Sequence, residues 1–238
     1  MEVIGQFKQK WLRLNIWWFV AICTVCVFAF FAIFAICERK SGETSESSGY
    51  PLAPLVAIDA GHGGIDRGAS GFGLFESDIN LAVATMLEKS LSTLNIQTVM
   101  TRTGDYGLYG TTDPGFKKRD MLERKNIVES SGASALISIH MNASSITDRT
   151  GVVIYCDFEN ESSLLLANSI ASGFESAKVK DGDFFITTKI DTPAVIVECG
   201  FITTPSEAYQ LGTSEYQEYL ANCIARGVLI YQRNLQEL

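Results

Sequence analysis

Apolar residues are grouped in two different ways along this chain. Residues 16–37 form one long apolar run without a charged side chain, whereas beyond residue 54 the apolar residues form short runs separated by longer amphipathic stretches. A short apolar run rich in β-branched residues predicts a buried strand, while apolar residues three and four apart predict a helix. The chain therefore divides into an N-terminal apolar segment and a domain of alternating strands and helices.

Five short runs in the domain predict strands. They are residues 55–59, 97–101, 135–140, 151–155 and 194–198, and residues 184–186 form a weaker sixth candidate. Helical spacing is found in residues 77–94, 120–130, 162–175 and 214–231. Such alternation predicts an α/β fold, with a mostly parallel central sheet flanked by helices on both faces.

The N-terminal run, residues 16–37, is long enough to cross a bilayer, which takes about 20 apolar residues. Basic residues precede it, and they favour an orientation with the N-terminus in the cytoplasm. We therefore expect residues 1–15 to be a short cytoplasmic segment, residues 16–37 a single transmembrane helix, and the domain to lie outside. A cleaved signal peptide is the competing interpretation, although its apolar region is usually only about 7–15 residues long.

The composition of the chain beyond residue 37 limits the kinds of protein and partner that are possible. Residues 38–52 are polar and rich in serine, which predicts a flexible linker. Residues 53–238 are enough for one domain with a sizeable core. The formal net charge of −8 at pH 7, without a basic stripe, argues against nucleic acid as a partner. Cys156, Cys199 and Cys223 are an odd number, so buried free thiols are expected rather than a paired disulfide framework.

Both histidines of the chain end an apolar run. His62 follows the first predicted strand in the sequence Asp59-Ala60-Gly61-His62-Gly63-Gly64, and His140 ends the predicted strand 135–140. Open α/β sheets bind ligands at the carboxyl ends of their strands, and two imidazoles there predict one zinc site. A single histidine beside a strand is more often a hydrogen-bonded core residue. Asp59 is expected to orient the His62 ring by accepting a hydrogen bond.

Carboxylates complete the candidate chemistry. Glu76 precedes the predicted helix 77–94 and would be the third ligand of a His₂Glu zinc site, which leaves one position open. Asp78 is a rival ligand, and an isolated acid at either position would simply be favoured by the helix dipole. Glu198 ends the apolar strand 194–198, where an unpaired carboxylate is costly to bury. We expect it to be a general base beside the metal, the alternative being a structural acid that caps a turn.

The segment 103–116 contains four glycines and one proline and has little periodicity. It predicts a surface loop at the end of the second strand. Such a loop could line a substrate groove, and a plain connector is an equally good interpretation.

Taken together and in this order, these segments resemble the zinc-dependent N-acetylmuramoyl-L-alanine amidases of bacterial cell walls. The resemblance covers nearly all of residues 54–232. It rests on DAGHGG (59–64), FESDINLAVA (75–84), a Thr-Arg pair (101–102), Arg124, SIHMNA (138–143) and PAVIVECGF (193–201). It implies that His62, Glu76 and His140 hold one Zn²⁺ ion and that Glu198 is the catalytic acid.

The resemblance also implies a substrate and a location. The expected reaction is zinc-dependent hydrolysis of the amide between N-acetylmuramic acid and L-alanine in peptidoglycan, at the outer side of a bacterial cell membrane. Asn142 and the backbone of Gly63 and Gly64 are candidate substrate contacts. Two alternatives remain: a zinc peptidase or deacetylase acting on another wall bond, and a membrane-tethered scaffold that binds peptidoglycan without cutting it. Spore-cortex maturation, division and turnover are all compatible settings, and protein activators are not indicated.

Overall fold

The computed structural model describes residues 54–146 and 148–237. The predicted cytoplasmic segment, transmembrane helix and linker lie outside these residues, so those three predictions stay predictions. Within the described ranges, no helix combines the length and the apolar character needed to cross a membrane.

A six-stranded sheet in the order β4-β1-β5-β8-β6-β7 forms the centre of the domain. Its strands are β1 (Leu55–Ala60), β4 (Gln97–Met100), β5 (Ala135–Asn142), β6 (Val152–Cys156), β7 (Ala177–Asp181) and β8 (Ala194–Phe201). Every neighbouring pair is parallel except β6 and β8, which are antiparallel. A small hairpin of β2 (Ser70–Gly71) and β3 (Leu74–Phe75) lies outside this sheet. The prediction of a mostly parallel sheet is confirmed.

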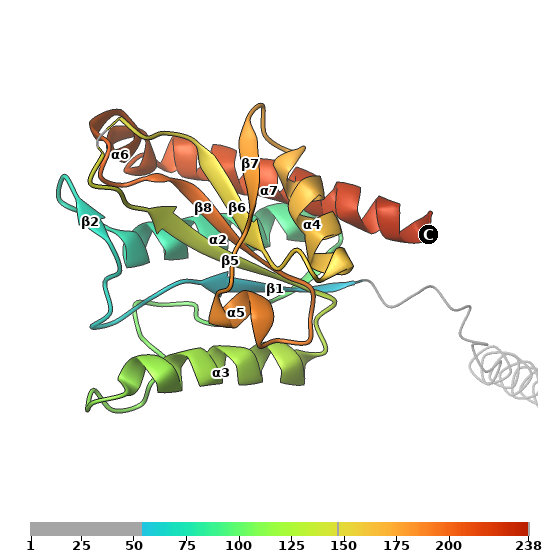
Figure 1. Ribbon diagram of the computed structural model, residues 1–238, viewed down its shortest axis with the longest axis horizontal. Helices are drawn as coiled ribbons and strands as arrows, with labels where there is room; N and C mark the ends of the chain where they lie inside the picture. Colours follow the sequence, from blue (N-terminus) through green and yellow to red (C-terminus); the bar gives the residue numbers. More distant parts are fainter. Residues whose placement is uncertain (1–53, 147, 238) are drawn as a thin grey trace, which may run out of the picture. The chain divides into compact units, whose positions relative to one another are not determined.

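Helices cover both faces of the sheet, as Figure 1 shows. One face carries α2 (Glu76–Thr93), α4 (Glu161–Ala171) and α7 (Ser214–Gln236), and the other carries α3 (Phe116–Ser131) and α5 (Phe185–Thr188). A further helix, α6 (Pro205–Leu211), follows β8 and packs against α7. The layered arrangement predicted from the alternation of strands and helices is therefore present.

Successive side chains along each strand point to opposite faces of the sheet, so the core consists of two apolar clusters of unequal size. In β5, Ile137 and Ile139 belong to the larger cluster beneath α2, α4 and α7, whereas Leu136 belongs to the smaller cluster on the side of α3 and α5. On that second face, β5 continues beyond Leu136 with Ser138 and His140. The smaller apolar cluster thus ends in polar side chains, and these lie at the carboxyl edge of the sheet.

Some local expectations were wrong. Residues 184–186 are the N-cap and the first two residues of helix α5 rather than a strand, because the amides of Thr187 and Thr188 donate hydrogen bonds to the carbonyl of Phe184 and close a helical turn. Strand β7 was not predicted, although its alternating pattern of half-buried Ala177 and Val179 with exposed lysines is that of an edge strand. The short α6 and the hairpin β2–β3 were not predicted either. The three cysteines of the domain are free and buried, as expected.

Helix α7 crosses α4 at Gly227. A Cβ atom added to Gly227 would lie only 2.3 Å from Cα of Ile170 in α4, so the two helices approach too closely for any side chain at this position. Glycine is therefore required here although it is a poor helix former.

We expect Gly227→Ala to lower the free energy of unfolding by about 1–3 kcal/mol, because overpacking outweighs the better helix propensity of alanine. Urea denaturation followed by circular dichroism measures this change. The exposed Glu218 on the same helix provides the control, since Glu218→Ala should leave the transition within about 0.5 kcal/mol of its original value. A stabilised Gly227→Ala protein would contradict the close helix crossing.

Candidate active site

Three predicted ligands, far apart in the sequence, meet at the carboxyl edge of the sheet. His62 lies in the turn after β1, Glu76 is the first residue of α2, and His140 lies near the end of β5. One ligand atom from each lies within 4.8 Å of the others. Oε1 of Glu76 is 2.9 Å from Nδ1 of His140 and 3.3 Å from Nε2 of His62.

The spacing of these atoms suits a small tetrahedral cation. Zinc bound at about 2.0–2.1 Å by nitrogen and oxygen ligands holds those ligands about 3.3 Å apart. Of the two Glu76 distances, the one to His62, 3.3 Å, matches this separation, and the one to His140, 2.9 Å, is slightly shorter. Two imidazoles and one carboxylate are also the donor set of zinc sites that keep a fourth position open. The residues therefore fit a catalytic zinc ion.

Glu76 is fixed from several directions. Its Oε2 accepts a 2.7 Å hydrogen bond from the Ala69 amide, and Oε1 accepts one of 3.1 Å from the Met141 amide. Burial alone would raise the pKa of Glu76, but the hydrogen bonds from His140 and His62 hold that pKa far below its ordinary value. A buried carboxylate is thus kept ionised and aimed at both imidazoles.

Asp78, the rival ligand, does not join the cluster. Its side chain is 53% exposed and lies 3.4 Å from the guanidinium of Arg67. Residues two apart on a helix point in different directions, so Glu76 and Asp78 cannot both face the histidines. The helical geometry of α2 therefore identifies Glu76, and not Asp78, as the residue that faces the histidines. Spacing in the sequence had not separated the two.

The backbone around His62 is unusual and closely packed. His62 itself has φ +62°, a left-handed conformation that is uncommon for a residue other than glycine. A Cβ at Gly61 would lie 2.3 Å from the His140 ring, and a Cβ at Gly68 would lie 2.5 Å from Oε2 of Glu76. Strained backbone of this kind is typical of functional sites, and here it brings the imidazole of His62 toward the other two ligands.

The carboxylate that orients the His62 ring is Asp66, not Asp59 as expected. Oδ2 of Asp66 lies 3.1 Å from Nδ1 of His62, on the side of the ring opposite Glu76. Burial lowers the pKa of His62, but Glu76 and Asp66 outweigh this effect and raise it. The sequence interpretation missed Asp66, although it follows His62 by four residues within the same glycine-rich turn.

Asp59 instead belongs to a buried network beneath the turn. It accepts hydrogen bonds from Arg124 (2.5 Å), Thr101 (2.7 Å) and Ser138 (2.6 Å). Burial by itself raises the pKa of Asp59, but Arg124 and the two hydroxyl groups lower it to about 2. The residue therefore acts on the backbone of the site through Arg124 rather than on the His62 ring.

Two fully buried arginines hold the turn that carries His62. Arg124 donates to the carbonyls of Ala60 (2.8 Å) and His62 (2.6 Å). Arg102 donates to the carbonyls of Ala60 (2.8 Å) and Gly61 (3.0 Å), and it also reaches the carbonyl of Ser77 in the first turn of α2. The pair thus fixes the end of β1 relative to the helix that supplies Glu76.

Glu198 stands beside the cluster because β8 is the parallel neighbour of β5. In the register of these strands His140 is paired with Glu198, so both side chains leave the same face of the sheet. Oε2 of Glu198 is buried and has no hydrogen-bond partner among the described residues. Burial raises the pKa of Glu198, the nearby Glu76 adds to this effect, and His140 and His62 oppose it. An unpartnered carboxylate with a raised pKa is suited to exchanging a proton.

The three predicted substrate contacts have different surroundings in the structure. The Gly63 amide donates to the carbonyl of Asp66 and the Gly64 amide donates to Oδ1 of Asp105, and the backbone contacts of these two residues with a substrate stay predictions. Asn142 lies at the end of β5, two residues beyond His140 and after an irregularity in its pairing with β8. Its half-buried side chain remains a candidate contact.

A pocket of about 290 Å³ opens next to the two histidines. Its walls come from α3, from α5 and from the carboxyl edge of the sheet, and its lining residues are Asp59, Gly61, His62, Asp66, Lys117, Asp120, Met121, Arg124, His140, Phe184, Phe185, Ile186 and Ile196. The loop 103–116 is not part of this lining. It instead supports the His62 turn, where the hydroxyl of Tyr109 accepts a hydrogen bond of 2.8 Å from the Ile65 amide.

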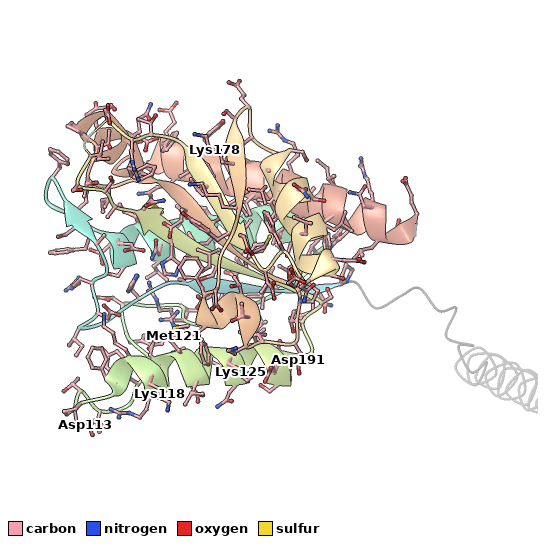
Figure 2. The ribbon with its side chains drawn as sticks, viewed as in Figure 1. Asp113, Lys118, Met121, Lys125, Lys178 and Asp191 are labelled. Carbon is pink, nitrogen blue, oxygen red and sulfur yellow. The ribbon has the colours of Figure 1, made fainter. Side chains whose placement is uncertain are left out.

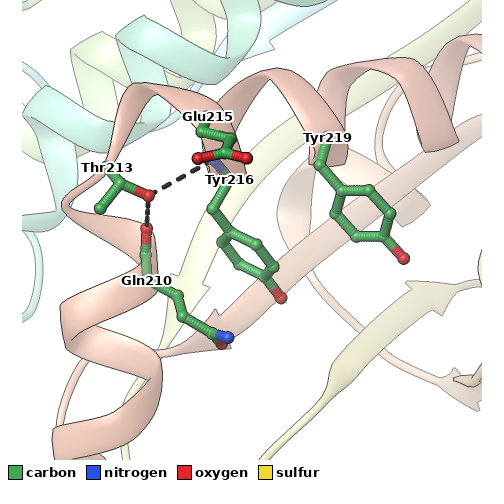
Figure 3. Close-up of a pocket in the computed structure, with 5 residues that line it drawn as sticks. All are labelled: Gln210, Thr213, Glu215, Tyr216 and Tyr219. Atoms are coloured by element: carbon green, nitrogen blue, oxygen red, sulfur yellow. Dashed lines mark hydrogen bonds between the residues drawn. The ribbon is translucent and has the colours of Figure 1, made fainter.

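A larger hollow, of about 540 Å³, lies at the junction of α6 and α7 (Figure 3). It is lined by Gln210, Thr213, Glu215, Tyr216 and Tyr219, and the two tyrosine rings are stacked at 5.6 Å. No imidazole or thiol lines it, and Thr213 is occupied as the N-cap of α7. The smaller pocket beside His62 and His140 is therefore the candidate active site.

The fold and this site together define a class of protein, an α/β protein with a mostly parallel sheet whose carboxyl edge carries a group of side chains that could hold a metal ion. The sequence model of the family described as N-acetylmuramoyl-L-alanine amidase matches residues 56–229. The chain belongs to this family, as its sequence motifs indicated, and peptidoglycan is the substrate that membership in the family implies.

Individual relatives agree with this assignment. An uncharacterized Bacillus subtilis protein, YqiI, is 38% identical over 184 residues, which cover 74% of this chain and 84% of that protein. The germination-specific N-acetylmuramoyl-L-alanine amidase of B. subtilis is 30% identical, with 74% and 79% covered. Among solved structures, the CwlD amidase of Clostridioides difficile, determined in complex with the GerS lipoprotein, gives a TM-score of 0.71 at 28% identity and covers 76% of this chain and 99% of its own.

We expect Glu76→Ala to abolish stoichiometric Zn²⁺ binding, because it removes one of three donors and the group that spaces both imidazoles. Calorimetric titration of the protein with Zn²⁺ measures the loss. Asp78→Ala is the matched control on the same helical turn and should bind zinc as the unaltered protein does. Zinc binding that survives Glu76→Ala but is lost in Asp78→Ala would reverse the assignment.

Proposed function

We propose that the protein is a zinc-dependent N-acetylmuramoyl-L-alanine amidase that hydrolyses the amide between the lactyl group of N-acetylmuramic acid and L-alanine. The observation that carries this proposal is the convergence of His62, Glu76 and His140, with Glu198 beside them on the neighbouring strand. Membership in the amidase family supports the bond that is cut.

His62, Glu76 and His140 would hold the metal. When bound, zinc supplies a Lewis acid that polarises the scissile carbonyl and lowers the pKa of water toward about 7. The protein contributes the orientation of the three ligands. Asp66 holds the His62 ring, and the amides of Ala69 and Met141 hold the two oxygens of Glu76.

Glu198 is proposed as the general base and then the general acid. Its unpartnered Oε2 would accept the proton of the attacking water, and the same oxygen would deliver that proton to the nitrogen of the leaving L-alanine. The raised pKa of this carboxyl group supports both steps, because a base whose pKa lies closer to neutrality also gives its proton back readily.

We further propose that residues 16–37 anchor the enzyme in a bacterial cell membrane with the catalytic domain outside. The support is the uncharged apolar run and the basic residues before it. For the setting, we propose spore-cortex peptidoglycan, and the support is the likeness to the germination-specific amidase of B. subtilis. Comparing the digestion of isolated spore cortex with that of vegetative sacculi tests this setting.

Glu198→Gln should lower kcat by about a hundredfold to ten-thousandfold, the usual contribution of general acid–base catalysis. The amide cannot take up the water proton, yet it has nearly the same shape. Digestion of purified sacculi followed by mass spectrometry measures the release of stem peptides that begin with L-alanine.

Two controls make this result interpretable. The Glu198→Gln protein should still bind one equivalent of Zn²⁺, and removal of metal from the unaltered protein by a chelator should abolish activity until Zn²⁺ is returned. Full activity of Glu198→Gln would refute the role of Glu198. Products cut at other peptide bonds, or released acetate, would identify a zinc peptidase or deacetylase, and an absence of products would identify a binding scaffold.

Removal of residues 16–37 should shift the protein from the membrane fraction to the soluble fraction, because this run is the proposed anchor. Fractionation of cells that express the full chain or the shortened chain, followed by immunoblotting, measures the shift. A full chain found in the membrane fraction at its full mass supports the anchor. A full chain that is shortened by about the mass of the N-terminal segment and recovered in the medium would instead identify a cleaved signal peptide.

A further inference from the structure

The pocket beside the two histidines has one apolar wall and one charged wall. Met121, Phe184, Phe185, Ile186 and Ile196 form the apolar side, between α3 and α5. Figure 2 shows Met121 on the side of α3 that faces α5. The pocket therefore continues from the metal ligands into a space between two helices, where the part of a substrate next to the scissile bond would lie.

Most charges of the pocket are already paired with one another. Asp59 and Asp120 both bind Arg124, at 2.5 and 2.6 Å, and all three groups are nearly inaccessible to solvent. Asp66 lies between His62 and Lys117, at 3.1 Å from each. An incoming ligand therefore does not meet a free buried charge in this wall.

Lys117 is also paired, with Asp66, but its charge is accessible to a ligand. Its side chain is 66% exposed, which makes it the one cation in the pocket lining that a ligand meets directly. Asp66 uses one of its contacts, and an ammonium group has three donors on a flexible stem, so it can bind a second carboxylate without releasing the first. The position thus favours a negatively charged group on the substrate.

The contacts through Asp66 set an upper limit on the distance between Lys117 and His62. Two contacts of 3.1 Å, through Asp66, connect Nζ of Lys117 with the ring of His62. Roughly two to three residues of extended chain, at about 3.5 Å each, cover such a span. A substrate held by its scissile carbonyl at the histidines would therefore bring its second residue near Lys117.

The chemistry of peptidoglycan places an acidic group at this point. L-alanine is followed by D-glutamate, which continues the stem through its side chain and leaves its α-carboxyl group either free or amidated. We propose that Lys117 is a specificity-determining residue that binds this free α-carboxylate and so favours stems with D-glutamate over stems in which the group is an amide. The inference rests on the proposed amidase function and deepens it by naming the substrate form.

The experiment compares two muramyl peptides that differ only at the second residue, with the α-carboxyl group free in one and amidated in the other. We expect the unaltered enzyme to cleave the free acid with a kcat/KM about fivefold higher, the upper range for an exposed ion pair, and the preference to shrink at high salt. Lys117→Gln should bring the ratio of the two kcat/KM values to about one, and Lys117→Glu should invert it.

The ratio isolates recognition from any structural effect. A change that Lys117→Gln transmits through Asp66 to His62 would slow both substrates equally and leave their ratio unaltered. Lys118→Gln removes a neighbouring positive charge of α3 that does not line the pocket, and it should keep the fivefold preference. Equal cleavage of both peptides by the unaltered enzyme, or a preference that survives Lys117→Gln, would overturn the inference. Failure of the unaltered enzyme to cleave either peptide would instead count against the proposed function.

Discussion

The candidate site depends on the way two buried arginines hold the end of β1. Arg102 and Arg124 together bind the carbonyl of Ala60, the last residue of β1, and the carbonyls of Gly61 and His62 in the turn that follows. Arg124 is neutralised by Asp59 and Asp120, and removing one partner of such a buried pair typically costs about 3–5 kcal/mol. The strained φ of His62 persists because the two arginines determine the path of the chain on both sides of His62.

The carboxyl edge of the sheet brings together ionisable side chains, and burying any one of them alone would be unfavourable. Glu76 is nearly buried, and its charge is tolerated because two imidazoles and two backbone amides face it. Glu198, one strand away, has no hydrogen-bond partner for its buried oxygen within residues 54–146 and 148–237, and its pKa is raised by burial and by Glu76. Two carboxylates of one site therefore differ in proton affinity, and this difference suits one to hold a cation and the other to move a proton.

On the charged wall of the pocket, one residue contacts both the candidate metal site and a solvent-exposed lysine. Asp66 both orients His62 and holds Lys117, so it links the candidate metal site to the entrance of the pocket. The apolar side chains from α3 and α5 form the opposite wall and give the pocket its shape. Asp66 therefore contributes both to the orientation of His62, the proposed metal ligand, and to the position of Lys117, the proposed substrate contact. A change at Asp66 would affect both.

The alternation of strands and helices, the mostly parallel sheet and the two histidines at strand ends can be predicted from the chain alone, because they depend on local periodicity and on the meeting of carboxyl ends at one edge. The packed fold was needed to choose Glu76 over Asp78, to place Asp66 rather than Asp59 at the His62 ring, and to show that Phe185 and Ile186 begin a helix. These outcomes depend on which way a side chain points and on contacts between distant segments. Spacing along a chain cannot specify such directions, because they arise only when helices and strands pack together.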